Sequence, residues 1–203
     1  MRRQPQQQRS RDMVERLLAA ARAVLERDGY ESFSTNRVAT AAGVSPGSLY
    51  QYFPDKHALV SAVVDRHTAA VSEQAAAALA DRIGESGPAM IRATAVALLD
   101  ALSADPELLR VVTEELPLSR DRARRQALER RVRELVVAWL AARPGQTRSV
   151  DHARTAWVLV TAVEHLTVRY VLDAPPIARD DFLDEVVVLC SGYLGPSPGP
   201  VRR

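Results

Sequence analysis

The chain of 203 residues has one cysteine, few aromatic residues and no long uninterrupted apolar run. A single cysteine, Cys190, excludes an intramolecular disulfide and supplies no metal framework, so we expect it to be a small buried hydrophobic residue. No stretch approaches the ~18 consecutive apolar residues of a membrane-spanning helix. The N-terminus is rich in Arg, Gln and Pro and lacks the apolar centre of a secretory signal. These absences predict a cytoplasmic protein with no membrane partner, and nothing in the sequence indicates a cofactor.

Lysine is nearly absent as well, because Lys56 is the only one and the other basic residues are arginines. The net charge is only +2, so any binding to nucleic acid must depend on local charge. Residues 1–60 hold nine basic and six acidic residues, a modest excess that is concentrated in the first eleven residues. With 47% hydrophobic residues the chain can bury a sizeable core and is not disordered.

Apolar residues recur at helical spacing along most of the chain, and we find no strand pattern and no internal repeat. The sequence therefore predicts an all-α fold of about nine helices. Residues 1–9 are expected to be a flexible basic arm and 195–203 a disordered tail. Breaks at Gly, Pro and capping residues, Ser149 among them, place the helices at about 10–28, 35–43, 46–53, 55–82, 88–103, 105–117, 120–142, 150–172 and 179–194.

The stretch from Ser34 to Lys56 reads as two short helices joined by a tight turn. Gly43 can end the first helix in a left-handed conformation, and Ser45 with Pro46 can begin the second. Leu49 and Phe53 are four residues apart and should point into the core. A helix, a short turn and a second helix with a polar face are the layout that presents a helix to the DNA major groove. The residues left facing outward are Pro46, Gly47, Ser48, Tyr50, Gln51 and Tyr52.

This stretch resembles the DNA-binding motif of the TetR family of transcriptional regulators over roughly the first third of the chain. The resemblance implies a DNA-binding domain at residues 10–70, with the motif at 34–53 and the helix from 55 as connector, and a ligand-binding and dimerisation domain at 71–194. The residues that carry it are Gly29, Tyr30, Phe33, Ser34, Thr35, Val38, Ala39, Ala42, Gly43, Val44, Ser45, Gly47, Ser48, Leu49, Tyr50, Tyr52, Phe53, Lys56 and Leu59.

By this resemblance, two sets of residues are expected to contact DNA. Asn36 and Gln51 can each make a bidentate contact to adenine, and Pro46 can contact a thymine methyl group. Lys56 opposes the dipole at the start of its helix, which favours a phosphate contact over a merely solubilising role. The expected base contacts are Asn36, Pro46, Gly47, Ser48 and Gln51. The expected phosphate contacts are Thr35, Arg37, Ser45, Tyr50, Tyr52 and Lys56, although Arg37 could also reach a base.

The segment at 150–172 has almost no polar face, and a helix that is apolar all round is buried all round. We therefore expect it to pack both on its own core and on a second subunit. The simplest arrangement is a homodimer joined by a four-helix bundle, two helices from each chain, and the family resemblance implies the same. The expected interface residues are Trp157, Val163, Leu166, Tyr170, Phe182, Val186 and Leu189.

Polar and aromatic residues in the larger domain are candidates for an effector pocket, which the family typically holds inside its helices four to eight. The histidines lack metal-ligand spacing, so we expect no metal site. Glu164 and His165 admit a catalytic interpretation, but neighbours on a helix point about 100° apart and no nucleophile accompanies them, so we expect no enzyme. An Arg-rich face at 120–133 is interleaved with acids and reads as a solvated helix face. The pocket candidates are His67, Thr113, Glu114, Trp139, Trp157, Thr161, Glu164 and His165.

The sequence thus predicts a homodimeric regulator, most simply a repressor, that binds a palindromic operator and is released by a small, apolar effector. Two alternatives remain open at this point. One is a small-molecule-binding or hydrolytic all-α enzyme that uses Glu164 and His165, and the other is a DNA-binding dimer without an effector.

Overall fold

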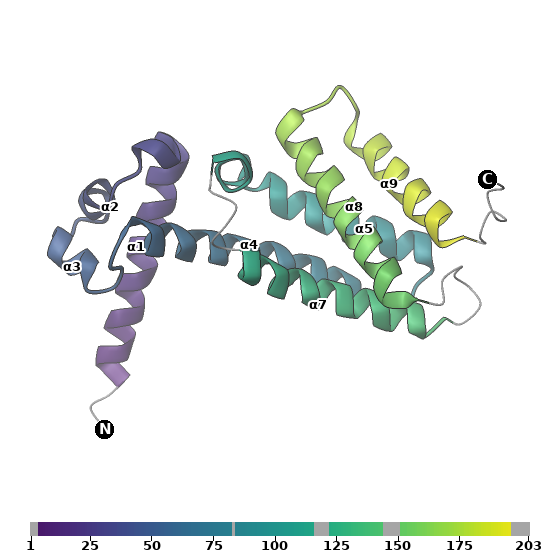
Figure 1. Ribbon diagram of the computed structural model, residues 1–203, viewed down its shortest axis with the longest axis horizontal. Helices are drawn as coiled ribbons and strands as arrows, with labels where there is room; N and C mark the ends of the chain where they lie inside the picture. The colour runs from purple at the N-terminus through teal and green to yellow at the C-terminus, as the bar shows by residue number, and fades with distance from the viewer. Residues whose placement is uncertain (1–3, 83, 116–121, 144–150, 196–203) are drawn as a thin grey trace. The chain divides into compact units, whose positions relative to one another are not determined.

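The computed structural model describes residues 4–82, 84–115, 122–143 and 151–195, and all regular structure within these ranges is helical (Figure 1). This confirms the predicted all-α fold. The elements are α1 (Gln4–Ser32), α2 (Thr35–Ala42), α3 (Pro46–Tyr50), α4 (Lys56–Asp81), α5 (Gly87–Ser103), α6 (Pro106–Arg110), the π-helical turn η1 (Val111–Glu115), α7 (Arg122–Ala141), α8 (His152–Asp173) and α9 (Arg179–Leu194).

Several predicted helix boundaries are wrong, among them the end of α3, which lies at Tyr50 and not near 53. Helix α1 begins at Gln4, so residues 4–9 are helical and do not form the expected flexible arm. Pro5 lies in the first turn, where its missing N–H costs nothing, and the Gln-rich residues that follow favour a helix. Helix α8 is capped by Asp151, whose carboxylate accepts the Arg154 N–H at 2.9 Å. The predicted cap Ser149 and the tail from 196 lie outside the described residues.

The chain divides into two compact units. The first comprises the residues up to Thr68 together with the described part of the segment Glu107–Arg122, and the second comprises Ala69–Pro106 and the residues from Ala123 on. The boundary between a DNA-binding and a ligand-binding domain near 70 stays a prediction. The segment that starts at Glu107 was expected in the larger domain, but its contacts place it in the first unit.

The first unit is built around one apolar cluster to which every one of its helices contributes. Leu17 and Leu25 of α1, Leu49 of α3 and Leu59 of α4 are completely buried. Each such side chain stabilises the fold by roughly 1.5–3 kcal/mol through its removal from water. Gly29 interrupts α1 with φ 70° and ψ 174°, a backbone conformation that a residue with a Cβ rarely adopts. The chain can therefore turn at Gly29 and continue toward α2.

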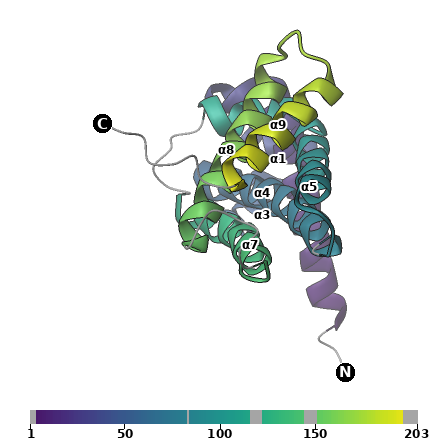
Figure 2. The same ribbon diagram turned by 90° about the vertical axis from the view of Figure 1, so that its right-hand side faces the viewer.

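In the second unit α8 and α9 lie side by side and both pack against α5 (Figure 1 and Figure 2). The rings of Tyr170 and Phe182 stack with centroids 4.1 Å apart and join α8 to α9. Arg92 of α5 forms ion pairs with Asp180 and Asp184 of α9. These contacts hold the three helices together. Within the described ranges, no helix combines the length and the hydropathy needed to cross a bilayer.

Candidate nucleic-acid interface

The helix–turn–helix from Ser34 to Tyr50 is shaped by three local signals, of which those at Gly43 and Ser45 are as predicted. Ser34 caps α2, with its Oγ accepting the Arg37 N–H at 3.3 Å. Gly43 ends α2 with φ 63° and ψ 39°, and this left-handed residue redirects the chain. Ser45 caps α3, with its Oγ accepting the Ser48 N–H at 3.1 Å, and Pro46 occupies the first turn. The turn between the helices is therefore fixed by backbone and cap chemistry alone.

The solvent-exposed side of this motif carries most of the predicted base-contacting residues. Leu49 is completely buried and Phe53 is 9% exposed, so α3 turns its apolar side inward. Ser48 is half-buried, and its hydroxyl lies 2.9 Å from that of the cap Ser45. The exposed members of the predicted set are Asn36, Pro46, Gly47 and Gln51, and Arg37 is exposed as well.

The two tyrosines of the motif have different environments. Tyr50 is 48% exposed, and its hydroxyl lies 2.9 Å from Oγ1 of Thr35, which joins α3 to the start of α2. Tyr52 is half-buried and packs against the core of the first unit. The expectation that both rings face outward is therefore wrong for Tyr52, because the chain has already left α3 at that residue.

Lys56 has partners within the protein. Its Nζ donates to the backbone oxygen of Tyr30 at 2.6 Å and lies 4.2 Å from the centroid of the Tyr30 ring. The side chain is half-buried and joins the first turn of α4 to the end of α1. This gives a structural reason for the only lysine in the chain, and its contact with a DNA phosphate stays a prediction.

The carboxylate of Asp28 links the end of α1 to α2. Asp28 accepts from Arg27 at 2.7 Å and from Arg37 at 2.9 Å. Chiefly the hydrogen bond from Arg27, helped by Arg37, lowers the pKa of Asp28 from 3.8 to about 2. Asp28 is therefore ionised at neutral pH and pairs with the guanidinium groups of Arg27 and Arg37.

The predicted pocket residues do not form one site within either unit. His67, Thr113 and Glu114 belong to the first unit, and the other five to the second. Trp139 is 4% exposed, in the core of the second unit. Thr113, Glu114, Trp157, Thr161 and His165 are exposed and Glu164 is half-buried, which corrects the expectation that these six line an interior cavity. Among the described residues, no three His, Cys, Asp or Glu side chains gather to hold a metal ion.

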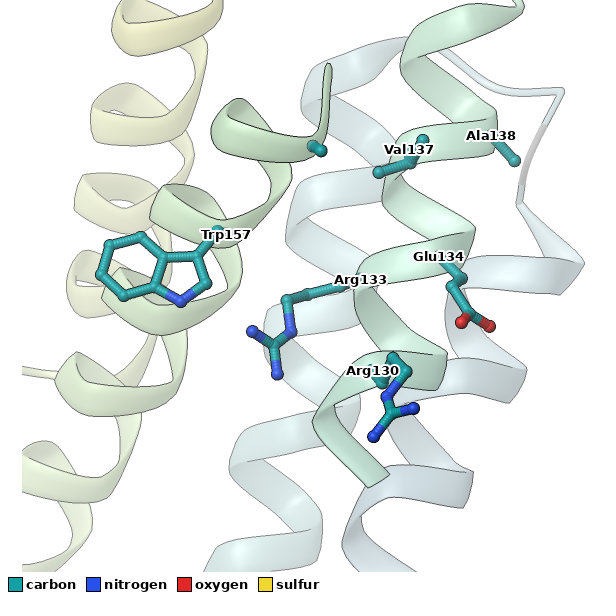
Figure 3. A pocket seen from close by; sticks show the side chains of 7 residues that line it. Arg130, Arg133, Glu134, Val137, Ala138 and Trp157 are labelled. Atoms are coloured by element: carbon teal, nitrogen blue, oxygen red, sulfur yellow. The ribbon is translucent and has the colours of Figure 1, made fainter. Parts of the chain in front are cut away.

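An open groove of about 640 Å³ lies between α7 and α8 (Figure 3). Trp157, which is 54% exposed, is the one predicted pocket residue in its lining. The view shows the Arg133 side chain extending from α7 toward α8, with Trp157 on the other helix. The other lining residues are Arg130, Glu134, Val137, Ala138 and Ala153. The groove is a surface feature, unlike the enclosed effector pocket that the sequence led us to expect.

The predicted interface residues also separate into two groups. Trp157, Leu166 and Leu189 are exposed, and Val163 and Tyr170 are half-buried. Phe182 and Val186 are 8% and 2% exposed and belong to the core that α9 shares with α5. Their assignment to the interface is therefore corrected, because the α9 stripe that carries them faces its own unit. Val188 was not among the predicted interface residues, but it is 64% exposed and so offers more apolar surface than Phe182 or Val186.

The structure joins two residues that sequence reasoning did not pair, Tyr30 and Glu115. The Tyr30 N–H donates to Oε2 of Glu115 at 2.7 Å, and its hydroxyl lies 3.3 Å from Nδ1 of His57. In the sequence, Tyr30 stands out only as one of the residues that carry the family resemblance. Glu115 is 85 positions away in sequence, so no local pattern could have paired the two.

Comparison with known families matches both parts of the chain. Residues 17–63 match the family described as "Bacterial regulatory proteins, tetR family". Residues 86–194, more than half of the chain, match "Tetracyclin repressor-like, C-terminal domain".

Two curated relatives are similar over about half of the chain or less. The DNA-binding transcriptional repressor TetR of Mycobacteroides abscessus is 36% identical over 106 residues, which are 51% of this chain and 54% of that protein. The HTH-type transcriptional repressor KstR of Mycobacterium tuberculosis is 44% identical over 54 residues, 26% of this chain and 24% of that protein. The chain thus spans about half the length of the first relative and a quarter of the second.

Solved structures share the fold over nearly the whole chain. A TetR-family transcriptional regulator from Mesorhizobium loti has a TM-score of 0.70 at 19% identity and covers 92% of this chain and 96% of its own. FadR from Bacillus subtilis, solved in complex with stearoyl-CoA, has a TM-score of 0.66 at 16% identity and covers 88% and 98%. At these identities the likeness shows the common fold.

Proposed function

Because the chain belongs to the tetR family of bacterial regulatory proteins and carries its helix–turn–helix domain, we propose that it is a sequence-specific transcriptional repressor. In this proposal it binds a palindromic operator as a homodimer and leaves it when a small, apolar effector binds. The observation that carries the proposal is the exposed polar face of the α2–α3 motif. The apolar side of the same motif is buried in the single core of the first unit.

The chemistry of that face suits the reading of base edges. Asn36 and Gln51 each offer an amide that can pair with both the N6 and N7 positions of adenine. Pro46 and Gly47 are exposed at the start of α3, where a short residue lets the helix approach the groove floor. Thr35 and Tyr50, tied by their hydroxyls at 2.9 Å, flank these residues as donors for phosphates. Arg37 adds a charge that Asp28 partly compensates.

A second copy of the chain is the proposed partner of the α8–α9 layer. Exposed apolar side chains are concentrated there, with Trp157 and Leu166 on α8 and Val188 and Leu189 on α9. A patch of this kind is costly in water and is typical of a subunit interface. Two copies related by a two-fold axis would bring two recognition motifs to half-sites separated by one helical turn of DNA.

The proposed effector is small and apolar, which suits an all-helical second unit with two apolar clusters. The fold neighbour FadR, with stearoyl-CoA in its structure, supports the idea that such a fold accommodates an apolar chain. The effector would act by changing the spacing between the two motifs. Loss of one half-site removes the avidity of the dimer, worth about 10²–10⁴ in affinity.

The experiment that tests DNA binding starts with selection of a duplex from a randomised pool by the full-length protein. Affinity for the selected site is then measured against salt, where log K should fall by about 0.9 per log unit of salt for each phosphate neutralised. Asn36→Ala and Gln51→Ala should lose discrimination at one or two base positions, by roughly 1–3 kcal/mol each. A selection that yields no enriched sequence at low salt would contradict the proposed function.

A further inference from the structure

One segment of the second half of the chain is built into the DNA-binding unit. Helix α6 and the turn η1 follow α5, which belongs to the second unit, yet their contacts are with the first. Leu108, Val111 and Val112 are buried, at 1%, 3% and 8% exposed, in the same cluster as Leu17, Val38 and Leu49. This segment therefore forms part of the core beneath the helix–turn–helix.

The end of this segment has an unusual backbone. Residues Val111–Glu115 form a π-helical turn, in which the hydrogen bonds run from i to i+5. Such turns are less favourable than an α-helix and are concentrated at functional sites. Here the turn continues α6 with its two valines in the core, and its last residue is Glu115.

Glu115 reaches the kink of α1. Its Oε2 accepts the Tyr30 N–H at 2.7 Å, a charge-assisted hydrogen bond. The same oxygen would lie 3.2 Å from a Cβ at Gly29, whose φ of +70° is itself unfavourable for other residues. Gly29 thus satisfies both the backbone angle and the close approach of the carboxylate.

Tyr30 of α1 contacts both η1 and α4. Besides Glu115 from η1, it contacts Lys56 of α4 through its backbone oxygen at 2.6 Å and through its ring. Four residues later Ser34 caps α2, and between them Phe33 is 3% exposed. The position of the Tyr30 backbone is therefore transmitted to the first turn of α2, which carries Thr35 and Asn36.

We propose that Glu115 is a positioning residue for DNA binding, whose carboxylate fixes the α1–α2 corner and so links the α6–η1 segment to the recognition motif. Glu115 is exposed to solvent, so the bond can be exchanged for water when the segment shifts. The proposal rests on the proposed function, because its consequence is measured on operator DNA.

The test compares three full-length variants on the selected duplex. Glu115→Ala removes the acceptor and should weaken binding roughly tenfold, as expected for a hydrogen bond to a charged group. Glu115→Gln keeps an oxygen acceptor and should restore most of the affinity. Glu114→Ala is the matched control, since Glu114 pairs with Arg110 of its own segment at 3.8 Å, and it should bind like the wild type.

An independent readout is the amide proton of Tyr30 in ¹⁵N–¹H spectra of the free protein. It should shift upfield in Glu115→Ala and stay near its wild-type position in Glu114→Ala. The inference is overturned if Glu115→Ala binds the duplex like the wild type, if Glu114→Ala weakens it equally, or if Glu115→Gln restores nothing. If the wild type itself selects no duplex, the proposed function fails, and the amide shift still decides whether Glu115 holds the corner.

Discussion

The hydroxyl of Tyr50, the last residue of α3, lies 2.9 Å from Oγ1 of Thr35, the first residue of α2. The two short helices of the motif are thus joined by a side-chain bond as well as by the turn at Gly43. Tyr50 is exposed and Thr35 is half-buried. The pair therefore joins the recognition helix to α2, and we expect it to contact DNA as well.

We expect Tyr50→Phe and Thr35→Val each to weaken operator binding on all sequences by roughly 0.5–1.5 kcal/mol, the net value of one hydrogen bond. Because the two groups act as a unit, the double variant should lose less than the sum of the single losses. A double-mutant cycle on the selected duplex measures this coupling. Strictly additive losses would show that the hydroxyls contact DNA independently.

The Arg37 side chain should contribute to the salt dependence of binding. Replacement by Ala is expected to reduce the slope of log K against log salt by about 0.9, the value for one phosphate contact. Arg22→Ala is the matched control, because Arg22 is an exposed arginine on α1 that pairs with Glu26 at 2.6 Å. If the salt dependence of Arg37→Ala is unchanged, Arg37 contacts no phosphate and its only role is to pair with Asp28.

The pKa of Asp28, lowered to about 2 from 3.8, makes the stability of the first unit depend on pH. The unfolded state binds the proton more readily, so the stabilisation is complete above about pH 4 and is lost as the pH falls through 2. Asp28→Asn should therefore have a lower Tm than the wild type at pH 5–6, and the gap should close toward pH 2. Thermal unfolding of both proteins from pH 2 to 6 measures this difference in Tm. A difference that stays constant with pH would contradict the role of Asp28.

The sequence predicted the caps and turns of the motif well because these depend on neighbouring residues. Ser34, Gly43 and Ser45 behave as their local preferences require. The contacts of Tyr30 and Lys56 were not predicted, because their partners are distant in sequence and only the fold brings them together. The same limit explains Phe182 and Val186, whose apolar character could not tell which of two faces, core or subunit interface, would bury them.

Cys190, predicted as a small buried hydrophobic residue, is 2% exposed in the α5–α9 core, and burial raises the pKa of its thiol to about 11. It should not react with a thiol reagent at pH 8 until the second unit unfolds. Cys190→Ser should destabilise that unit by about 1–3 kcal/mol, because a hydroxyl costs more to bury than a thiol. Cys190→Ala should cost less, and rapid labelling of the native protein would contradict the buried placement.

Leu189 is 51% exposed on α9 beside Val188 at 64%, and in the proposed dimer both side chains are covered by the second subunit. A charge at this position would be buried without a partner, so Leu189→Glu should convert the dimer to a monomer. Binding to the palindromic duplex should then fall by about 10²–10⁴ while binding to a half-site stays unchanged. Asp181→Asn, about two turns away on the same helix, is the control that should remain dimeric. Sedimentation analysis alongside DNA titration distinguishes the cases, since a Leu189→Glu protein that still sediments as a dimer would place the interface elsewhere.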